Sequence, residues 1–334
     1  MAHDPFATAP GAALCPVSEL GVLLFEGDDA LAFLQGQLSS DVVALAPGDS
    51  QWSTYNSPKG RVLANMRLWR DPDAPSGRTF GALVAADLAG AIAKRLAMFV
   101  LRAKVAIAEA TGGHVVLGVA GPGASAAMRA AFDVVPAPDK VVTVAGGTAR
   151  ALALPDGRYL LIGIAEAEPA LRRALAPHTF AGDGNLWRVC SIQAGIPLVT
   201  AATTDHFVLQ MLNFDALGGV SFQKGCYPGQ EVVARTRYLG RLKERLYGFR
   251  MATAAPASGA RLYSPAFGDQ PCGTVVNAAT NAAGDAVLLA VVQIAAVESG
   301  GVAVGAADGP VPEPVALPYA VETVAPQRPQ AVLR

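Results

Sequence analysis

Cysteine, histidine and net charge are all scarce in this chain of 334 residues. The four cysteines are Cys15, Cys190, Cys226 and Cys272, with no Cys-x-x-Cys pair and no histidine at ligand spacing. This pattern excludes a common zinc motif and is too sparse for a disulfide scaffold. We therefore expect reduced thiols, no metal site and a cytoplasmic location.

The charge balance and the hydrophobic runs exclude two further classes of protein. The formal net charge is −1, whereas a general nucleic-acid binder usually carries a strongly basic domain, so we expect no nucleic-acid partner. The N-terminus lacks the basic and apolar regions of a signal peptide. The most apolar run, residues 286–297, is too short to span a bilayer. We expect no membrane partner and interpret this run as a buried strand.

Hydrophobic periodicity favours an α+β fold with mostly antiparallel sheets. Residues 1–16 look like a loose N-terminal arm. Strands are predicted at 20–27, 80–86, 104–110, 114–121 and 158–164, and a hairpin at 52–70 turns at Ser-Pro-Lys-Gly. Helices are predicted at 28–38, 87–101, 124–132, 169–176, 185–197 and 205–215. Asp28 or Asp29, Asp87 and Asp205 are the predicted caps of three of them.

The character of the sequence changes near residue 247. From there, short apolar runs alternate with Gly, Pro, Asn and Asp, which is typical of a small β-barrel or sandwich. We predict an α+β core over residues 1–246, with two subdomains, and a C-terminal β-barrel over residues 247–334.

The densest chemistry lies in FQKGCYPGQEVVAR, residues 222–235. Pro228 and Glu231 suit a helix start, which would place Cys226 just before a helix N-terminus. Such a terminus and the nearby ammonium of Lys224 both favour a reactive thiolate. A blander alternative is that the glycines and the proline form a tight turn and that Cys226 fills a small hole. The local pattern leaves both interpretations open.

Together with WRVCSIQAGIP (187–197), the run from residue 207 to residue 246 resembles the YgfZ-type folate-binding proteins. These are relatives of the glycine-cleavage T-protein, an aminomethyltransferase. YNSPKGRVLANMRL (55–68) and GQLSSDV (36–42) resemble the first domain of that family. The resemblance implies a three-domain cloverleaf around a central channel that holds tetrahydrofolate. It also implies a role in the assembly or repair of iron–sulfur clusters, with client enzymes or cluster-assembly proteins as transient partners.

The resemblance also assigns site residues. Cys226 and Lys224 match the motif cysteine and lysine, so we expect Cys226 to do thiol chemistry at the mouth of the channel, tuned by Lys224. One cysteine cannot hold a [4Fe–4S] cluster, so its bond to iron, to sulfur or to a partner thiol would be transient. The candidate folate-binding residues are Tyr55, Asn56, Arg61, Arg188, Gln193, Tyr227, Gln230, Glu231 and Arg235. For the arginines, a solvated surface is the blander alternative.

Two departures from the T-protein pattern bear on catalysis. Ala64 and Asn65 stand where the T-protein has adjacent aspartates, one of which acts in aminomethyl transfer. Gln193 stands where the T-protein holds the pterin with a glutamate; a glutamine can hydrogen-bond a pterin but cannot accept a proton as a carboxylate does. Whether the chain is an enzyme stays open. The alternatives are a tetrahydrofolate-dependent aminomethyltransferase or demethylase, and a folate-binding module with a structural cysteine.

Overall fold

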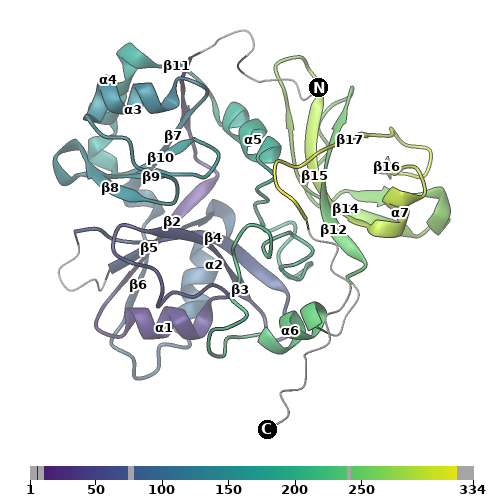
Figure 1. Cartoon of the computed structure of the whole chain (residues 1–334), viewed down its shortest axis with the longest axis horizontal. Helices are drawn as coiled ribbons and strands as arrows, with labels where there is room; N and C mark the ends of the chain where they lie inside the picture. The colour runs from purple at the N-terminus through teal and green to yellow at the C-terminus, as the bar shows by residue number, and fades with distance from the viewer. Residues whose placement is uncertain (1–5, 7–10, 74–78, 239–241, 322–334) are drawn as a thin grey trace.

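Three β-sheets organise the chain, and the helices pack around and between them (Figure 1). The computed structural model describes residue 6 and residues 11–73, 79–238 and 242–321. In these parts of the chain all but one of the paired strands are antiparallel, as the sequence predicts. The predicted α+β class is therefore confirmed.

The first sheet has the strand order β3-β4-β5-β2-β6. Its strands are β2 (Leu20–Glu26), β3 (Ser50–Asn56), β4 (Val62–Arg70), β5 (Thr79–Ala85) and β6 (Ala106–Glu109). Strand β4 alternates strictly: Val62, Ala64, Met66 and Leu68 enter one hydrophobic core. The intervening side chains, among them Asn65 and Arg67, face the opposite side. The polar residues of β4 thereby reach the centre of the molecule.

The second sheet has the order β11-β1-β7-β10-β9-β8. It comprises β1 (Ala13–Pro16), β7 (His114–Ala120), β8 (Val141–Val144), β9 (Ala149–Ala153), β10 (Tyr159–Ile164) and β11 (Phe180–Ala181). The prediction of a loose arm is wrong for Ala13–Pro16, which pairs with β7 and β11, about 100 and 165 residues further along the chain. The rest of that predicted arm, apart from Phe6, Gly11 and Ala12, lies outside the described residues.

The third sheet has the order β16-β13-β14-β15-β12-β17. Its strands are β12 (Glu244–Met251), β13 (Arg261–Tyr263), β14 (Pro271–Thr280), β15 (Ala286–Gln293), β16 (Ala303–Val304) and β17 (Glu313–Val315). The predicted buried strand, residues 286–297, is β15 as far as Gln293, and its remaining residues belong to the short helix Ile294–Glu298. The edge strands β16 and β17 are short and pair with no other edge among the described residues, so the sheet curls without closing into the predicted barrel.

Seven α-helices occur in the described ranges. They are α1 (Ala30–Gln37), α2 (Ala86–Ala97), α3 (Ala124–Phe132), α4 (Glu168–Leu175), α5 (Gly184–Gln193), α6 (Gln230–Tyr238) and α7 (Ile294–Glu298). Short 3-10 turns lie at Thr111–Gly113, Ala145–Gly147, Ala165–Ala167, Ala176–His178 and Pro265–Phe267. Helix α5 contacts both the second and the third sheet, and Figure 1 shows it in the middle of the molecule.

Two predicted caps serve other partners. Asp29 lies at the start of α1, but its carboxylate accepts the N–H of Lys104 at 2.7 Å. Asp87 lies inside the first turn of α2 and accepts the N–H of Ala201 at 3.0 Å. Helix α2 also ends at Ala97 rather than at the predicted residue 101, and Phe99 beyond its end is exposed. Both carboxylates accept N–H groups that lie far away in the sequence, so the local sequence cannot reveal these partners.

The predicted helix over residues 205–215 is wrong. This segment forms consecutive turns between the first and third sheets. Asp205 and Asn213 have φ values of 61° and 59°, a left-handed conformation that an α-helix cannot include. Asp205, the predicted cap, instead accepts the hydroxyl of Ser57 at 2.9 Å.

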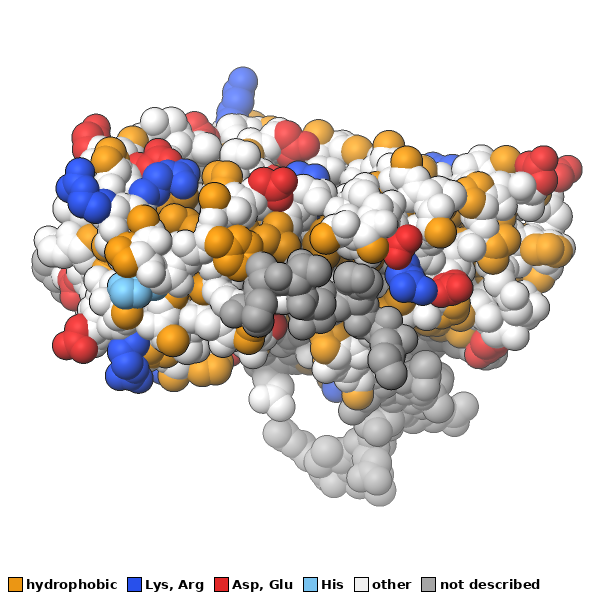
Figure 2. Space-filling view, turned by 90° about the horizontal axis from the view of Figure 1, so that it is seen from above, with side chains coloured by type: hydrophobic (Ala, Val, Ile, Leu, Met, Phe, Trp, Pro, Cys, Tyr) orange, Lys and Arg blue, Asp and Glu red, His pale blue; other side chains and the backbone are white. Residues whose placement is uncertain are grey.

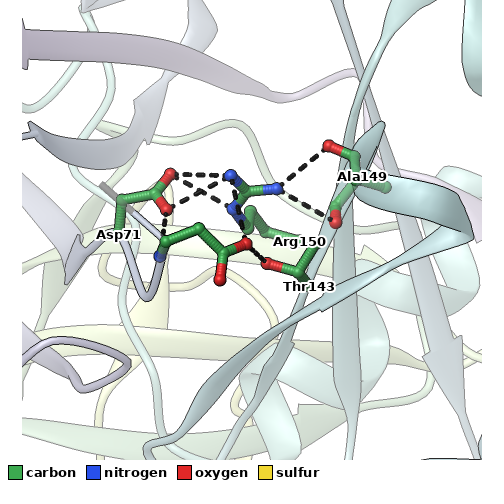
Figure 3. A network of polar contacts seen from close by, with 6 residues as sticks. Asp71, Thr143, Ala149 and Arg150 are labelled. Carbon is green, nitrogen blue, oxygen red and sulfur yellow. Dashed lines mark hydrogen bonds and ion pairs between the residues drawn. The ribbon is translucent and has the colours of Figure 1, made fainter. Parts of the chain in front are cut away.

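Ion pairs fix the first sheet against the second. Arg150 on β9 binds both carboxylate oxygens of Asp71, at 3.1 and 3.2 Å, and Thr143 on β8 donates to Asp73 (Figure 3). The pairs Arg67–Asp139 and Lys140–Asp49 connect the same two sheets. These polar contacts connect the two sheets at their junction.

Candidate functional site: a cavity between three sheets and a separate thiol loop

A cavity of about 490 Å³ lies where the three sheets meet. Its walls come from β3, β4 and β5 of the first sheet, from β10 of the second sheet, from α5 and from β14 of the third sheet. Residues 256–258, between β12 and β13, also line it. The segment 196–200, which follows α5, completes the lining. This size and position are typical of a pocket for one cofactor-sized molecule.

Two tryptophan–arginine stacks form parts of the wall. The guanidinium of Arg67 lies 5.2 Å from the ring centre of Trp52, its cross-strand neighbour. The guanidinium of Arg158 lies 4.4 Å from the ring centre of Trp187 on α5. Gly118 on β7 makes room for that indole, because a Cβ there would overlap the ring. The stacks give the cavity flat, amphipathic surfaces.

Both guanidiniums are buried and paired. Arg67, only 2% exposed, pairs with Asp139 and donates to Ser50 Oγ at 2.8 Å, while its Nε has no partner among the described residues. Burial lowers the pKa of Arg67, and the hydrogen bond and charge of Asp139 oppose that shift. Arg158 pairs with Asp156 and donates to Ser191 Oγ at 2.8 Å. These residues escaped the sequence analysis; a charged residue inside an apolar strand, such as Arg67, was the available signal.

Two asparagines hold the segment 196–200. Asn65 on β4 donates to the carbonyl of Pro197 at 3.1 Å and accepts the N–H of Val199 at 2.7 Å. Asn277 on β14 donates to the carbonyl of Leu198 at 2.9 Å and accepts its N–H at 2.8 Å. An aspartate at either position could not donate, so the amide is what this backbone requires. Asn65, one of the two predicted departures from the T-protein pattern, therefore holds this backbone segment.

Of the predicted folate-binding residues, Arg188 alone lines this cavity. Its Nε donates to Glu19 at 2.8 Å, and its side chain is 42% exposed. Gln193 follows on the same helix but lines a small hollow between α5 and β12, on the side of the third sheet. The other predicted residues lie in a second region.

That second region consists of the motif loop, residues 224–229, of helix α6 after it, and of the turn between β3 and β4, on which the loop packs. Gly229 has φ +77° and lies so close to this turn that an added Cβ would be 2.6 Å from Gly60 Cα. Arg61 donates to the carbonyl of His206 beside it. The sequence elements Ser-Pro-Lys-Gly and Lys-Gly-Cys-Tyr-Pro-Gly-Gln-Glu are therefore in direct contact.

Tyr55 and Asn56, before that turn, are fully buried. The Tyr55 hydroxyl interacts with Arg95 of α2, and burial raises its pKa. Both amide atoms of Asn56, which is 1% exposed, lack a partner among the described residues. On α6, Glu231 and Arg235 are exposed and Gln230 is half-buried. None of these five residues lines the cavity.

The motif loop itself alternates between buried anchors and an exposed thiol. Lys224 and Tyr227 are buried, whereas Gly225 and Cys226 between them are exposed. The other three cysteines are buried, and burial raises the pKa of Cys15 to about 12. Burial lowers the pKa of Lys224 to about 8, and the negative charge of Asp41 opposes this shift. Burial raises the pKa of Tyr227 to about 12. Cys226 is therefore the accessible thiol of the described chain.

No group of three or more His, Cys, Asp or Glu side chains in the described ranges could hold a metal ion. Within the same ranges, every helix is too short or too polar to cross a membrane.

Comparison with known proteins agrees with these features. No family model matches the chain. The "tRNA-modifying protein YgfZ" of Yersinia pestis (strain Pestoides F) is 32% identical over 266 residues, covering 77% of this chain and 79% of that protein. The protein of the same name from Pectobacterium carotovorum (strain PC1) is 33% identical over 255 residues, covering 74% and 75%.

A solved structure shares the fold. The glycine-cleavage aminomethyltransferase T of Bartonella henselae superposes with a TM-score of 0.72, covering 97% of this chain and 89% of that one, at 16% identity. This likeness establishes a T-protein-like fold and nothing about activity. The sequence likeness is much closer, and on that ground the chain belongs to the YgfZ family.

Proposed function

We propose that this protein binds tetrahydrofolate in the cavity between the three sheets and serves the assembly or repair of iron–sulfur clusters in other enzymes. The observation that carries the proposal is the cavity itself, which combines flat aromatic walls with buried, paired guanidiniums at the junction of a T-protein-like fold. The thiol of Cys226, on a separate exposed loop, is the proposed reactive group.

The residues present fit a folate. A cavity of about 490 Å³ is within the range of roughly 300–1,000 Å³ for such ligands. Trp52 and Trp187 offer surfaces for a pterin or a benzoyl ring. Arg188 is half-exposed and suits the carboxylates of the glutamate tail, since a guanidinium binds carboxylates bidentately. The buried Nε of Arg67, which has no partner in the described part of the chain, is consistent with a polar group or water nearby.

Bound tetrahydrofolate would supply a carrier of one-carbon units. The chain's own contribution would be to orient it between the two stacks and to exclude water. Cys226 offers one thiolate, enough for a transient bond to iron or to sulfur but not for a resident cluster. The predicted role of Lys224 in tuning this thiol is reconsidered below.

The names of the relatives point to tRNA. A cluster-dependent client enzyme that modifies tRNA would reconcile those names with the proposed role. Direct tRNA binding has less support, because the chain has a net charge of −1. On the face drawn in Figure 2, acidic and basic side chains of the described residues are interspersed rather than gathered into one basic area.

A second candidate, a T-protein-type transferase, is favoured by the shared fold. The cavity offers it little acid–base chemistry. Asn65 has no carboxylate, Glu19 pairs with Arg188, and Asp87 accepts the N–H of Ala201. Formation of methylene-tetrahydrofolate from an aminomethyl donor would establish this candidate in place of the first.

The test combines binding with complementation. Calorimetric titration with several tetrahydrofolate forms should give saturable binding, weakened about three- to tenfold in Arg188→Ala by loss of a partly exposed ion pair. Arg173→Ala, an exposed arginine on α4, is the matched control and should bind as wild type does. In a strain lacking the protein, Cys226→Ala should fold but fail to restore cluster-dependent enzyme activity. Full complementation by that variant would contradict the proposed thiol chemistry.

A further inference from the structure

The side chain of Lys224 reaches away from its own loop into the end of helix α1. Its ammonium donates to three backbone carbonyls: Gln35 at 2.6 Å, Leu38 at 2.6 Å and Ser40 at 2.9 Å. We propose that Lys224 is a positioning residue, which locks the motif loop onto the C-terminus of α1, and that it does not activate the Cys226 thiol directly. This inference rests on the proposed function only where it gives Cys226 a chemical role.

The hydrogen-bond capacity of the ammonium supports this. A lysine ammonium has three N–H donors, and three carbonyl oxygens lie within hydrogen-bond distance of it. None remains to stabilise a thiolate at Cys226. Lys224 is also buried, whereas Cys226, two residues later, is exposed. The two side chains therefore occupy different environments.

The carbonyls at the C-terminus of helix α1 explain why the ammonium of Lys224 binds there. The last carbonyls of a helix lack partners inside it and carry a partial negative charge, which a cation near them stabilises. Helix α1 has no basic residue in its last turn. Lys224, nearly 190 residues further along the chain, supplies the missing cation and donors. This contact joins the motif loop to the first sheet's helix in a way that local sequence does not predict.

Tyr227 and Gly229 hold the other side of the loop. The Lys224 ammonium lies 5.2 Å from the ring centre of the buried Tyr227, a cation–π distance. Gly229 packs against Gly60 of the β3–β4 turn. Cys226 thus lies in a short exposed stretch between anchors on both sides.

The anchor segment also supports the cavity. Ser40 Oγ donates to Ser53 Oγ at 2.7 Å, and Thr54 donates to Ser39 Oγ through both its N–H and its hydroxyl, at 2.8 and 2.9 Å. Ser53 and Thr54 follow Trp52 on β3, and Trp52 lines the cavity. Through its hydrogen bonds to carbonyls of residues 35–40, Lys224 sets the position of the motif loop relative to the cavity wall.

Hydrogen exchange of a Lys224→Met variant tests the lock. Methionine keeps the length of the side chain but has no donor, so amides in residues 36–40 and 222–229 should exchange at least about tenfold faster than in wild type. Lys94→Met is the matched control, because Lys94 is an exposed lysine in the last turn of α2. It should change exchange in these segments less than about twofold. Unchanged exchange in Lys224→Met would overturn the proposal.

The pH profile of Cys226 alkylation separates positioning from activation. If Lys224 only positions the loop, the midpoint of the profile stays within about 0.3 pH units of wild type in Lys224→Met, whereas loss of a direct activator moves it up by about one unit. An upward shift with unchanged hydrogen exchange would show that Lys224 acts on the thiol itself.

Competitive labelling of the wild-type protein tests the same contact without a variant. It therefore remains a valid test if Lys224→Met fails to fold. With a trace of acetic anhydride at a pH above about 11, where lysine amines are mostly neutral, Lys224 should react at least about tenfold more slowly than Lys94, since burial and three hydrogen bonds protect its amine. Equal rates would refute the lock. None of these readouts needs a folate or a cluster, so failure of the lock and failure of the proposed function are distinguishable.

Discussion

The central cavity and the motif loop use polar residues in opposite ways. In the cavity, Arg67, Arg158 and Asn65 are held by protein partners inside the junction of the sheets, and their loss would disturb the structure. In the motif loop, the side chain of Cys226 is exposed, whereas Lys224 and Tyr227 on either side of it are buried. The residues of the motif loop therefore do not form the cavity.

This difference predicts that substitutions in the two regions have different consequences. Changes in the cavity wall should cost stability and any ligand affinity together. Changes at the exposed part of the motif loop should cost thiol chemistry and little stability. The four substitutions below test that division, from the largest expected effect to the smallest.

Arg67→Ala should have the largest effect. The substitution removes a side chain that is 2% exposed, its stack on Trp52 and its hydrogen bond to Ser50, and it leaves a hole between the sheets. We expect a loss of about 3 kcal/mol in the free energy of unfolding, measured by urea denaturation. Arg173→Ala, exposed on α4, should change it by less than about 0.5 kcal/mol. Equal stability of the two variants would mean that the cavity wall is not structural.

Asn65→Asp should cost about 2 kcal/mol at neutral pH, because the donor to the carbonyl of Pro197 is lost and a charge is buried. The introduced carboxyl has a raised pKa in the folded state, so the penalty appears above its unfolded value of about 4 and shrinks below it. Gln223→Glu makes the same change on an exposed residue beside the motif loop and should be neutral. Urea denaturation at pH 3.5 and 7 measures both; a pH-independent penalty at position 65 would refute the explanation.

Tyr319→Phe should cost about 1 kcal/mol through its hydrogen bond to the carbonyl of Gly195, at 2.7 Å, which fixes the end of α5 next to the cavity. Burial raises the pKa of Tyr319 from 10 to about 12. The folded state therefore keeps a proton that the unfolded state releases, and this stabilisation, complete below pH 10, is lost as the pH rises towards 12. The difference in unfolding free energy between wild type and Tyr319→Phe should shrink between pH 9 and 11.5; a constant difference would contradict the assignment.

Gly225→Ala should have the smallest effect on stability, within about 0.5 kcal/mol. A Cβ at Gly225 meets no described atom within 4 Å, and its φ is not positive, so the fold does not require glycine there. If the loop presents Cys226 to a large partner, the added methyl should slow reaction with a protein disulfide but not with iodoacetamide. Equal slowing of both reagents would argue for a change in the loop itself.

The sequence predicted most elements because alternation and helical periodicity are local signals. The hairpin of β3 and β4, helix α3 at its full length and the buried strand β15 follow from such patterns. Long-range contacts decided what local patterns could not. Strand β1 pairs with partners about 100 residues or more away, and Asp205 and Asn213 turn a helix-like run into turns.

In the candidate site, too, local sequence patterns revealed one part and long-range contacts determined the other. The motif marked the loop that carries Cys226, and the structure shows that this thiol is exposed and that the loop contacts the Ser-Pro-Lys-Gly turn. It did not mark the cavity, because Arg67 and Arg158 acquire meaning only through Trp52, Trp187, Asp139 and Asp156 on other elements. Nor did it reveal that the ammonium of Lys224 binds carbonyls of residues 35–40.

A comparative titration with tetrahydrofolate tests most directly whether the ligand site and the thiol site are separate. We predict that Cys226→Ala binds tetrahydrofolate with the wild-type Kd, because Cys226 does not line the cavity. Trp52→Ala, which removes one aromatic wall, should weaken binding at least about tenfold. Weakened binding in Cys226→Ala together with unchanged binding in Trp52→Ala would contradict the account and place the folate at the motif loop.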